Sequence, residues 1–151
     1  MSYYLHKSHN VSVLLYHYVC PTKYRRVIFD ESVDRILTQT CMEISKRYEM
    51  NIVEIGTDGD HVHFLIQAAP MMSPTTIIRT IKSITAKEIF RLCPKVQKKL
   101  WGGKLWTAGY FVNTVGRSGN EKQIVNYVRN QGKEYKKFYR GTIDDTLGGQ
   151  T

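Results

Sequence analysis

The sequence predicts an α+β fold with an antiparallel sheet, and three observations support this prediction. Short apolar runs rich in Val, Ile, Leu and Tyr alternate with longer segments whose apolar residues recur at helical spacing. These segments follow one another in the order β-α-β-β-α-β, the ferredoxin-like arrangement with two helices on one face of the sheet. The 151 residues, 42% of them hydrophobic and 23% charged, are enough for one domain with a buried core.

The first half of the chain is expected to contain three strands and one helix. A run over 11–20 that is rich in Val, Leu and Tyr is the expected first strand. Asp30 is the expected N-cap of an amphipathic helix that ends near Glu49. Asp58-Gly59 is a turn signal between two apolar runs and therefore indicates a hairpin. The strands of this hairpin are expected over 52–55 and 62–68.

The second half is expected to add a helix, a strand and a further helix. Ser73-Pro74 provides a cap and a first helical position, and Pro94 ends this helix before a short basic connector over 95–101. The remaining elements are expected over 104–115, as a strand, and over about 120–139, as an extra C-terminal helix. Residues 1–140 are expected to form a single domain, and residues 141–151 a flexible tail.

Two histidines, His61 and His63, flank one apolar residue at the start of the second hairpin strand. Side chains alternate between the two faces of a strand, so both imidazoles should point away from the core, on the sheet face that the helices do not cover. The two residues are then about 7 Å apart along the strand, close enough to bind one divalent ion. Strand histidines with ordinary hydrogen bonds are the alternative. His17 has no such spacing and is expected to be an ordinary residue.

Charge is divided unevenly along the chain. The formal net charge is +9, yet residues 1–70 carry 7 Lys and Arg against 8 Asp and Glu, and residues 71–151 carry 15 against 5. This asymmetry favours a nucleic acid partner over a generic basic surface. The candidate DNA-backbone contacts are Arg79, Lys82, Lys87, Lys98, Lys99 and Lys104, each of which could instead belong to a solvated face. Aromatic residues that could stack bases, but are expected to pack in the core or a dimer, are Trp101, Trp106, Tyr110 and Phe111.

A candidate nucleophile and a candidate third metal ligand lie in the last expected helix. Tyr127 and Gln131 are four residues apart and would share a helix face. A tyrosine phenol can attack a phosphodiester, and a divalent metal that polarises the phosphate eases this attack. The Gln131 oxygen would complete His61 and His63 as a hard-metal site with open positions. Ordinary helix packing and surface exposure are the alternatives for Tyr127 and Gln131.

The segment Gly59-Asp60-His61-Val62-His63-Phe64-Leu65-Ile66, together with Tyr127 and Gln131, resembles the single-tyrosine HUH transposases of the bacterial insertion sequence 200/605 (TnpA-like) family. The U of HUH stands for a hydrophobic residue, here Val62. The resemblance covers roughly residues 11–139. Relaxases and many rolling-circle initiators share the histidine strand but commonly use a third histidine, so Gln131 favours the transposase branch.

The resemblance implies an enzyme that acts on single-stranded DNA with hairpins at the element ends. His61, His63 and Gln131 would hold Mg²⁺ or Mn²⁺, and Tyr127 would form a 5′-phosphotyrosine linkage before strand transfer rejoins the ends. It also implies a homodimer in which the Tyr127 helix can complete the partner's site.

Two other functions stay open at this stage. A non-catalytic ferredoxin-like nucleic-acid-binding module, such as a domesticated repressor or RNA binder, would share the basic second half. A metal-dependent hydrolase of small substrates fits less well, because Leu65 stands where the extension His-x-His-x-Asp requires aspartate. Three widely spaced cysteines indicate a reducing cytoplasm, and no apolar run reaches the roughly 18 residues of a transmembrane helix.

Overall fold

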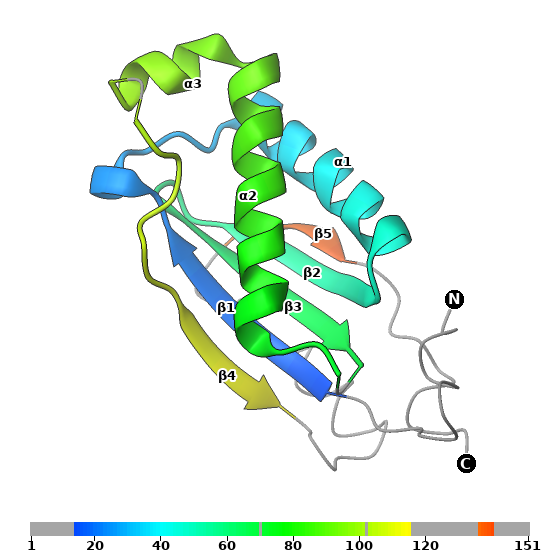
Figure 1. Ribbon diagram of the computed structural model, residues 1–151. Helices are drawn as coiled ribbons and strands as arrows, with labels where there is room; N and C mark the ends of the chain where they lie inside the picture. Colours follow the sequence, from blue (N-terminus) through cyan, green and yellow to red (C-terminus); the bar gives the residue numbers. More distant parts are fainter. Residues whose placement is uncertain (1–13, 70, 102, 116–135, 141–151) are drawn as a thin grey trace.

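The computed structural model describes residues 14–69, 71–101, 103–115 and 136–140, which form one antiparallel sheet with helices on one face (Figure 1). The elements are β1 (Leu14–Pro21), the 3-10 helix η2 (Lys23–Arg25), α1 (Glu31–Arg47), β2 (Met50–Thr57), β3 (His61–Ala68), α2 (Pro74–Leu92), α3 (Pro94–Lys99), β4 (Phe111–Val115) and β5 (Lys136–Arg140). The strand order is β4-β1-β3-β2-β5, and every neighbouring pair is antiparallel. The predicted α+β class and the β-α-β-β-α-β order of the first four strands are therefore confirmed.

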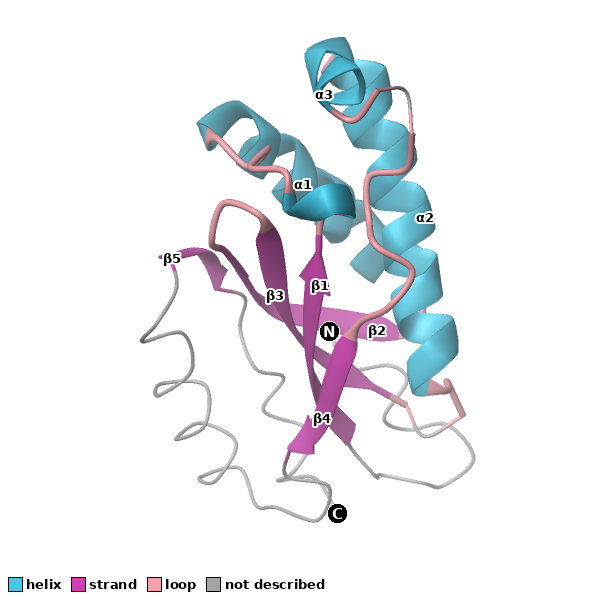
Figure 2. Cartoon of the chain, turned by 90° about the vertical axis from the view of Figure 1, so that its left-hand side faces the viewer, coloured by secondary structure: helices cyan, strands magenta, loops and turns pink. Residues whose placement is uncertain are grey.

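The hydrophobic core lies between the sheet and the pair α1 and α2, which cover the same face (Figure 2). Val62, Phe64 and Ile66 of β3 point into this core and are completely buried. Burial of each such side chain contributes roughly 1.5–3 kcal/mol. Because a shift of one residue would turn this apolar row outward, the core fixes the face on which His61 and His63 lie.

Both predicted helix starts are confirmed by their capping hydrogen bonds. The Asp30 carboxylate accepts from the backbone N–H of Val33 at 2.9 Å, at the start of α1. The Ser73 hydroxyl accepts from the backbone N–H of Thr76 at 3.1 Å, and Pro74 takes the first position of α2. Each cap satisfies a backbone donor that has no partner within the helix.

The hairpin turn between β2 and β3 is fixed from outside as well as by its own sequence. Gly59 has φ +69°, a left-handed conformation that glycine adopts without strain. The backbone N–H of Ile28 donates to the Gly59 carbonyl, and the N–H of Thr22 donates to the Asp60 carbonyl at 2.9 Å. The segment after β1 therefore holds the turn that leads into His61.

The predicted strand over 104–115 is wrong in its first part, because only Phe111–Val115 forms a strand. Residues 104–110 instead run alongside α2 (Figure 2), with Trp106 buried in the core. The Lys82 ammonium donates to the carbonyls of Thr107 and Gly109 at 3.0 and 2.8 Å. These tertiary contacts satisfy carbonyls that a strand would have paired with a neighbour.

Two further predicted boundaries need correction. The basic connector after Pro94 forms the short helix α3, with the proline at its first position. The last predicted helix is wrong over 136–139, where β5 pairs with β2. Edge pairing gives the backbone of β2 hydrogen-bond partners that a helix could not supply. The rest of that predicted helix and the predicted tail lie outside the described residues.

The sheet face opposite the helices is only partly open. Leu15 of β1 and Leu65 and Gln67 of β3 lie on this face and are at most 1% exposed. His61 and His63, at the start of β3, are only half-buried. The accessible part of this face therefore includes the end of β3 that carries the two histidines, together with the neighbouring Val19 of β1 and Phe111 of β4.

Candidate metal and nucleic acid site

The two histidines of β3 lie close together on the expected face. The ring centroids of His61 and His63 are 5.1 Å apart, with the rings edge to face. His61 keeps 18% of its side chain exposed, so a small ligand can reach it. Burial, together with the neighbouring His17 and His61, lowers the pKa of His63 from 6.5 to about 3. His63 is therefore neutral at physiological pH, the form that can donate a lone pair to a metal.

Asp60 fixes the orientation and proton position of His61. Its carboxylate Oδ1 lies 2.8 Å from His61 Nδ1. Burial opposes ionisation of Asp60, but hydrogen bonds from His61 and Arg25 outweigh it and hold the pKa of Asp60 below its usual value. An ionised carboxylate only accepts, so Nδ1 of His61 carries a proton. In the neutral ring the lone pair is then on Nε2, which lies 3.6 Å from the Asp58 carboxylate. The Arg25 guanidinium binds both Asp60 oxygens, at 3.0 and 3.2 Å.

His17 belongs to this site although the sequence predicted an ordinary residue. It lies on β1 and pairs in register with Leu65. Its Nε2 is 3.1 Å from His63 Nδ1, and the two rings stack with centroids 5.3 Å apart. If His63 donates its Nδ1 proton to His17, the lone pair of His63 lies on Nε2. The alternation of side chains along β1 could have placed His17 on the face without helices. It identifies His63 as the partner of His17 only once the pairing of β1 with β3 is known.

The donor set fits a divalent cation held by histidine Nε2 atoms. In metal-binding histidines the ring nitrogen that does not bind the metal typically donates its N–H to a carboxylate or another acceptor, as Nδ1 of His61 does to Asp60. Within the part of the chain that the structure describes, no three His, Cys, Asp or Glu side chains form a metal-binding group. Gln131 is the residue predicted to supply the further ligand. Gln131 and Tyr127 both lie outside the described residues.

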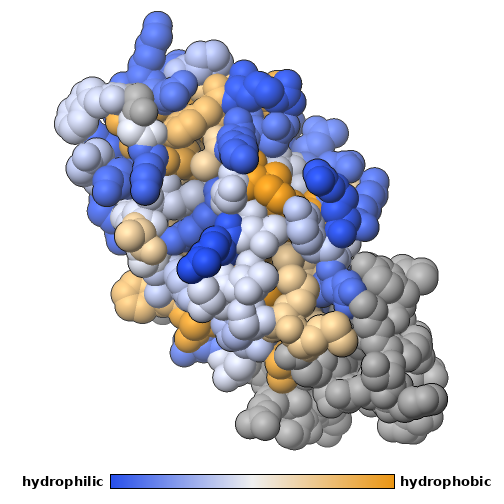
Figure 3. All heavy atoms as spheres, viewed as in Figure 1, coloured by the Kyte–Doolittle hydropathy of each residue, from blue (hydrophilic) through white to orange (hydrophobic). Residues whose placement is uncertain are grey.

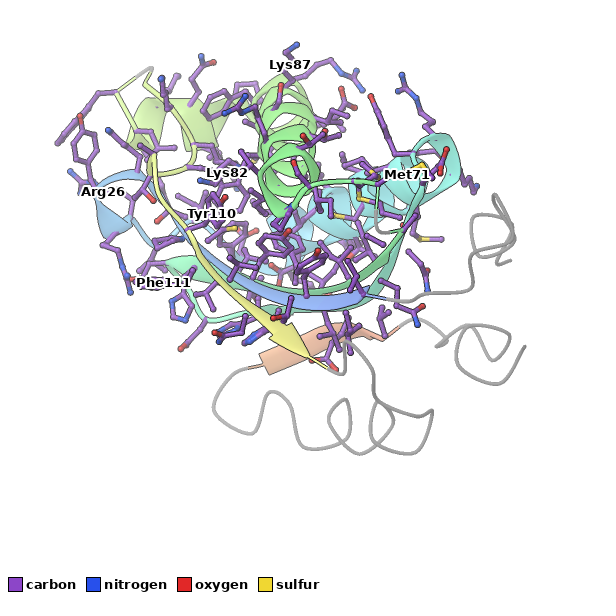
Figure 4. The ribbon with its side chains drawn as sticks, turned by 60° about the horizontal axis from the view of Figure 1, so that its bottom comes forward. Arg26, Met71, Lys82, Lys87, Tyr110 and Phe111 are labelled. Atoms are coloured by element: carbon purple, nitrogen blue, oxygen red, sulfur yellow. The ribbon has the colours of Figure 1, made fainter. Side chains whose placement is uncertain are left out.

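The six predicted DNA contacts fall on two surfaces. Arg79, Lys82, Lys87 and Lys104 line a groove of about 730 Å³ between α2 and the segment before β4. Hydrophilic side chains gather over α2 and α3 on the face shown in Figure 3. Lys82 points to Tyr110 in Figure 4, and its ammonium is 5.3 Å from that ring. Lys98 and Lys99 lie apart from this groove, on α3, in a second pocket beside η2.

The predicted stacking aromatics differ in their exposure. Trp106 is buried, and its indole N–H donates to the Thr85 hydroxyl at 3.1 Å. Trp101 and Phe111 are 72% and 70% exposed. Core packing is therefore confirmed for Trp106, whereas the single chain leaves Trp101 and Phe111 open to solvent.

Comparison with known proteins assigns the family. The family model described as "Transposase IS200 like" matches residues 10–131, which include the histidine strand and both Tyr127 and Gln131. The chain belongs to this family. IS200-like transposases are enzymes of insertion sequences, so DNA transposition is the process in which this family acts.

Individual IS200-like relatives cover most of the chain. It is 29% identical over 118 residues to the ISDra2 transposase TnpA of Deinococcus radiodurans, which covers 78% of this chain and 84% of that protein. It is 27% identical over 121 residues to the transposase for insertion sequence element IS200 of Salmonella typhimurium, with 80% and 78% covered. The crystal structure of a proposed transposase from D. radiodurans R1 matches with a TM-score of 0.58 and 30% identity, covering 79% and 91%. In the described part of this IS200-like chain, no helix has the length and apolar character needed to cross a bilayer.

The low pKa of His63 predicts a specific dependence of stability on pH. An unfolded His63 titrates near 6.5, whereas the folded one titrates near 3. Between these values the unfolded chain binds more protons, so the free energy of unfolding should fall as the pH falls from about 6.5 toward 3. His63→Phe should make the Tm of the metal-free protein less sensitive to pH between 5 and 7.5. Parallel Tm profiles for the two proteins would contradict the prediction.

Proposed function

We propose that this chain is a metal-dependent single-strand DNA transposase in which Tyr127 is the nucleophile. The observation that carries the proposal is the pair His61 and His63, whose Nδ1 atoms lie at hydrogen-bond distance from Asp60 and His17. In the proposed site both rings carry a proton on Nδ1 and bind the metal through Nε2. The family membership and the presence of Tyr127 and Gln131 within the matched residues support the same function.

The chemistry is a transfer of one phosphodiester to the protein and back. The Tyr127 oxygen attacks the scissile phosphorus, forming a Tyr–O–P bond while the bond from phosphorus to the 3′-oxygen breaks. The phenol gives up its proton as it attacks, and the leaving 3′-oxygen takes up a proton and becomes a free 3′-hydroxyl. A 3′-hydroxyl later attacks the phosphotyrosine and releases Tyr127. The phosphotyrosine keeps the phosphodiester's bond energy, so the reaction needs no nucleoside triphosphate.

The residues around the reacting phosphate have separate parts in this chemistry. His61, His63 and Gln131 would hold Mg²⁺ or Mn²⁺, which polarises the phosphate and stabilises the developing charge. Asp60 holds His61 in the correct tautomer, and its own orientation depends on Arg25. Nε2 of His17 would accept a hydrogen bond from the Nδ1–H of His63, which leaves Nε2 of His63 for the metal.

DNA binding is assigned to the basic second half. The proposed substrate is single-stranded DNA with end hairpins, with its phosphates contacted by Arg79, Lys82, Lys87, Lys98, Lys99 and Lys104. Lys82 already uses two of its three donors on backbone carbonyls, so it offers fewer bonds to a phosphate than the others. We further propose a homodimer in which the Tyr127 helix can complete the partner's site.

A covalent adduct tests the proposal directly. The protein is incubated with single-stranded DNA from the flanks of its own gene and with Mg²⁺ or Mn²⁺, then run on a denaturing gel. We expect a protein–DNA adduct that a chelator abolishes. Tight DNA binding without any adduct would overturn the enzymatic proposal and support the non-catalytic binding module.

A further inference from the structure

A second surface, near the histidines, exposes aromatic rings among positive charges. The rings of Tyr24 and Trp101 have centroids 5.6 Å apart. The Arg26 guanidinium lies 4.6 Å from the centroid of the Trp101 ring, at the edge of the molecule beside α3 (Figure 4). A pocket of about 630 Å³ is formed here, which we call the Trp101 pocket, and its lining includes Tyr24, Arg25, Arg26, Lys98, Lys99 and Trp101.

The backbone of this pocket is strained, and burial does not offset the strain. Tyr24, Arg25 and Trp101 have φ values of +58°, +51° and +53°, in the left-handed region that disfavours residues with a side chain. Tyr24 and Trp101 nevertheless remain 59% and 72% exposed. Strained backbone that presents large rings to solvent is typical of a ligand site rather than of a packing element.

We propose that the Trp101 pocket stacks an unpaired base of single-stranded DNA, an inference that rests on the proposed function. The residues that line it include four cations and no carboxylate. Its aromatic faces can stack on any base, and its exposed lysines can contact the phosphates on either side. This combination of stacking rings and a positive groove is typical of sites that bind single strands without reading their sequence.

The position of the pocket links it to the histidine site. Arg25 lines the pocket and binds both oxygens of Asp60, which in turn hydrogen-bonds to His61. The same segment also fixes the hairpin turn, because the N–H of Ile28 donates to the Gly59 carbonyl. The pocket and the histidines are thus connected through one side-chain relay, and a single strand held by the pocket lies next to the proposed cleavage site.

The test compares two oligonucleotides with the same phosphates. The full-length protein, in chelator to prevent cleavage, is titrated with oligothymidylate and with an abasic strand of equal length. We expect about 5- to 150-fold tighter binding of oligothymidylate, as one stacked base provides. Trp101→Gly should bind both strands alike, and glycine accepts the left-handed φ, so the fold is kept. Trp101→Phe keeps a ring and should retain most of the preference.

Two lysine variants separate stacking from charge. Lys99→Gln, in the pocket, should weaken binding to both strands equally and lower the slope of log affinity against log salt by about one. Lys46→Gln is the matched control, because Lys46 lies on α1 and pairs with Glu43 at 3.7 Å. It should leave both affinities unchanged.

Three outcomes would overturn the inference. The first is a Trp101→Gly protein that still prefers oligothymidylate over the abasic strand. The second is a wild type without this preference, which would indicate an anion-binding surface only. The third is tighter binding of oligouridylate than of oligothymidylate, which would indicate RNA. The adduct assay is scored separately. An adduct together with a preference independent of Trp101 would overturn only the pocket. A Trp101-dependent preference without an adduct would overturn only the transposase chemistry.

Discussion

Replacing Tyr127 with Phe should abolish cleavage of single-stranded DNA while leaving DNA binding intact. The substitution removes only the phenolic oxygen, which is the atom that forms the bond to phosphorus in the proposed reaction. Activity should fall to below about one thousandth of wild type, the scale of loss for a residue that acts as a nucleophile. The measurement is the yield of covalent adduct and of free 3′-hydroxyl strand at saturating protein.

The control for this variant removes a hydroxyl from a tyrosine in the described part of the fold. Tyr48, at the end of α1, is half-buried, and Tyr48→Phe should cleave like the wild type. Hairpin DNA affinity is measured for both variants. If Tyr127→Phe still cuts at the same phosphate, the nucleophile is a different residue or water, and the assignment of Tyr127 is wrong.

Replacing His63 with Ala should remove a metal ligand and leave the hairpin-binding surface unchanged. The affinity for Mn²⁺ is measured by calorimetry on the protein without DNA. Loss of a hydrogen bond that supports a ligand lowers metal affinity by about 10- to 100-fold, and loss of the ligand His63 should lower it further. Cleavage should fall with it, because the proposed chemistry needs the polarised phosphate. DNA affinity, measured in chelator, should stay near the wild-type value.

A graded series distinguishes a metal site from a structural histidine pair. His17→Ala and Asp60→Ala leave both proposed histidine ligands in place but remove the partners of their Nδ1 atoms. Each should lower Mn²⁺ affinity by about 10- to 100-fold, less than His63→Ala. A loss of DNA binding or of folding in His63→Ala that matches its loss of metal affinity would instead show that the histidines are structural.

Local patterns in the sequence determined most of the first four strands and the first two helices. Asp30 and Ser73 start their helices because a side-chain oxygen can satisfy a free backbone N–H within three residues, which depends only on local sequence. The face of His61 and His63 follows from the alternation with Val62 and Phe64. These features need no information from distant parts of the chain.

Other features depended on contacts between distant segments, and the sequence could not supply them. The apolar residues over 136–139 recur at helical spacing, but this segment pairs with the edge of β2. Residues 104–110 run along α2 because the Lys82 ammonium binds two of their carbonyls. His17 reaches His63 only through the pairing of β1 with β3, 46 residues apart. Arg25 and Trp101 reach their places through left-handed backbone, which the sequence pattern did not predict. The sequence by itself determined the family and the histidine pair, whereas the tertiary structure decided which side chains support that pair and which surface lies beside it.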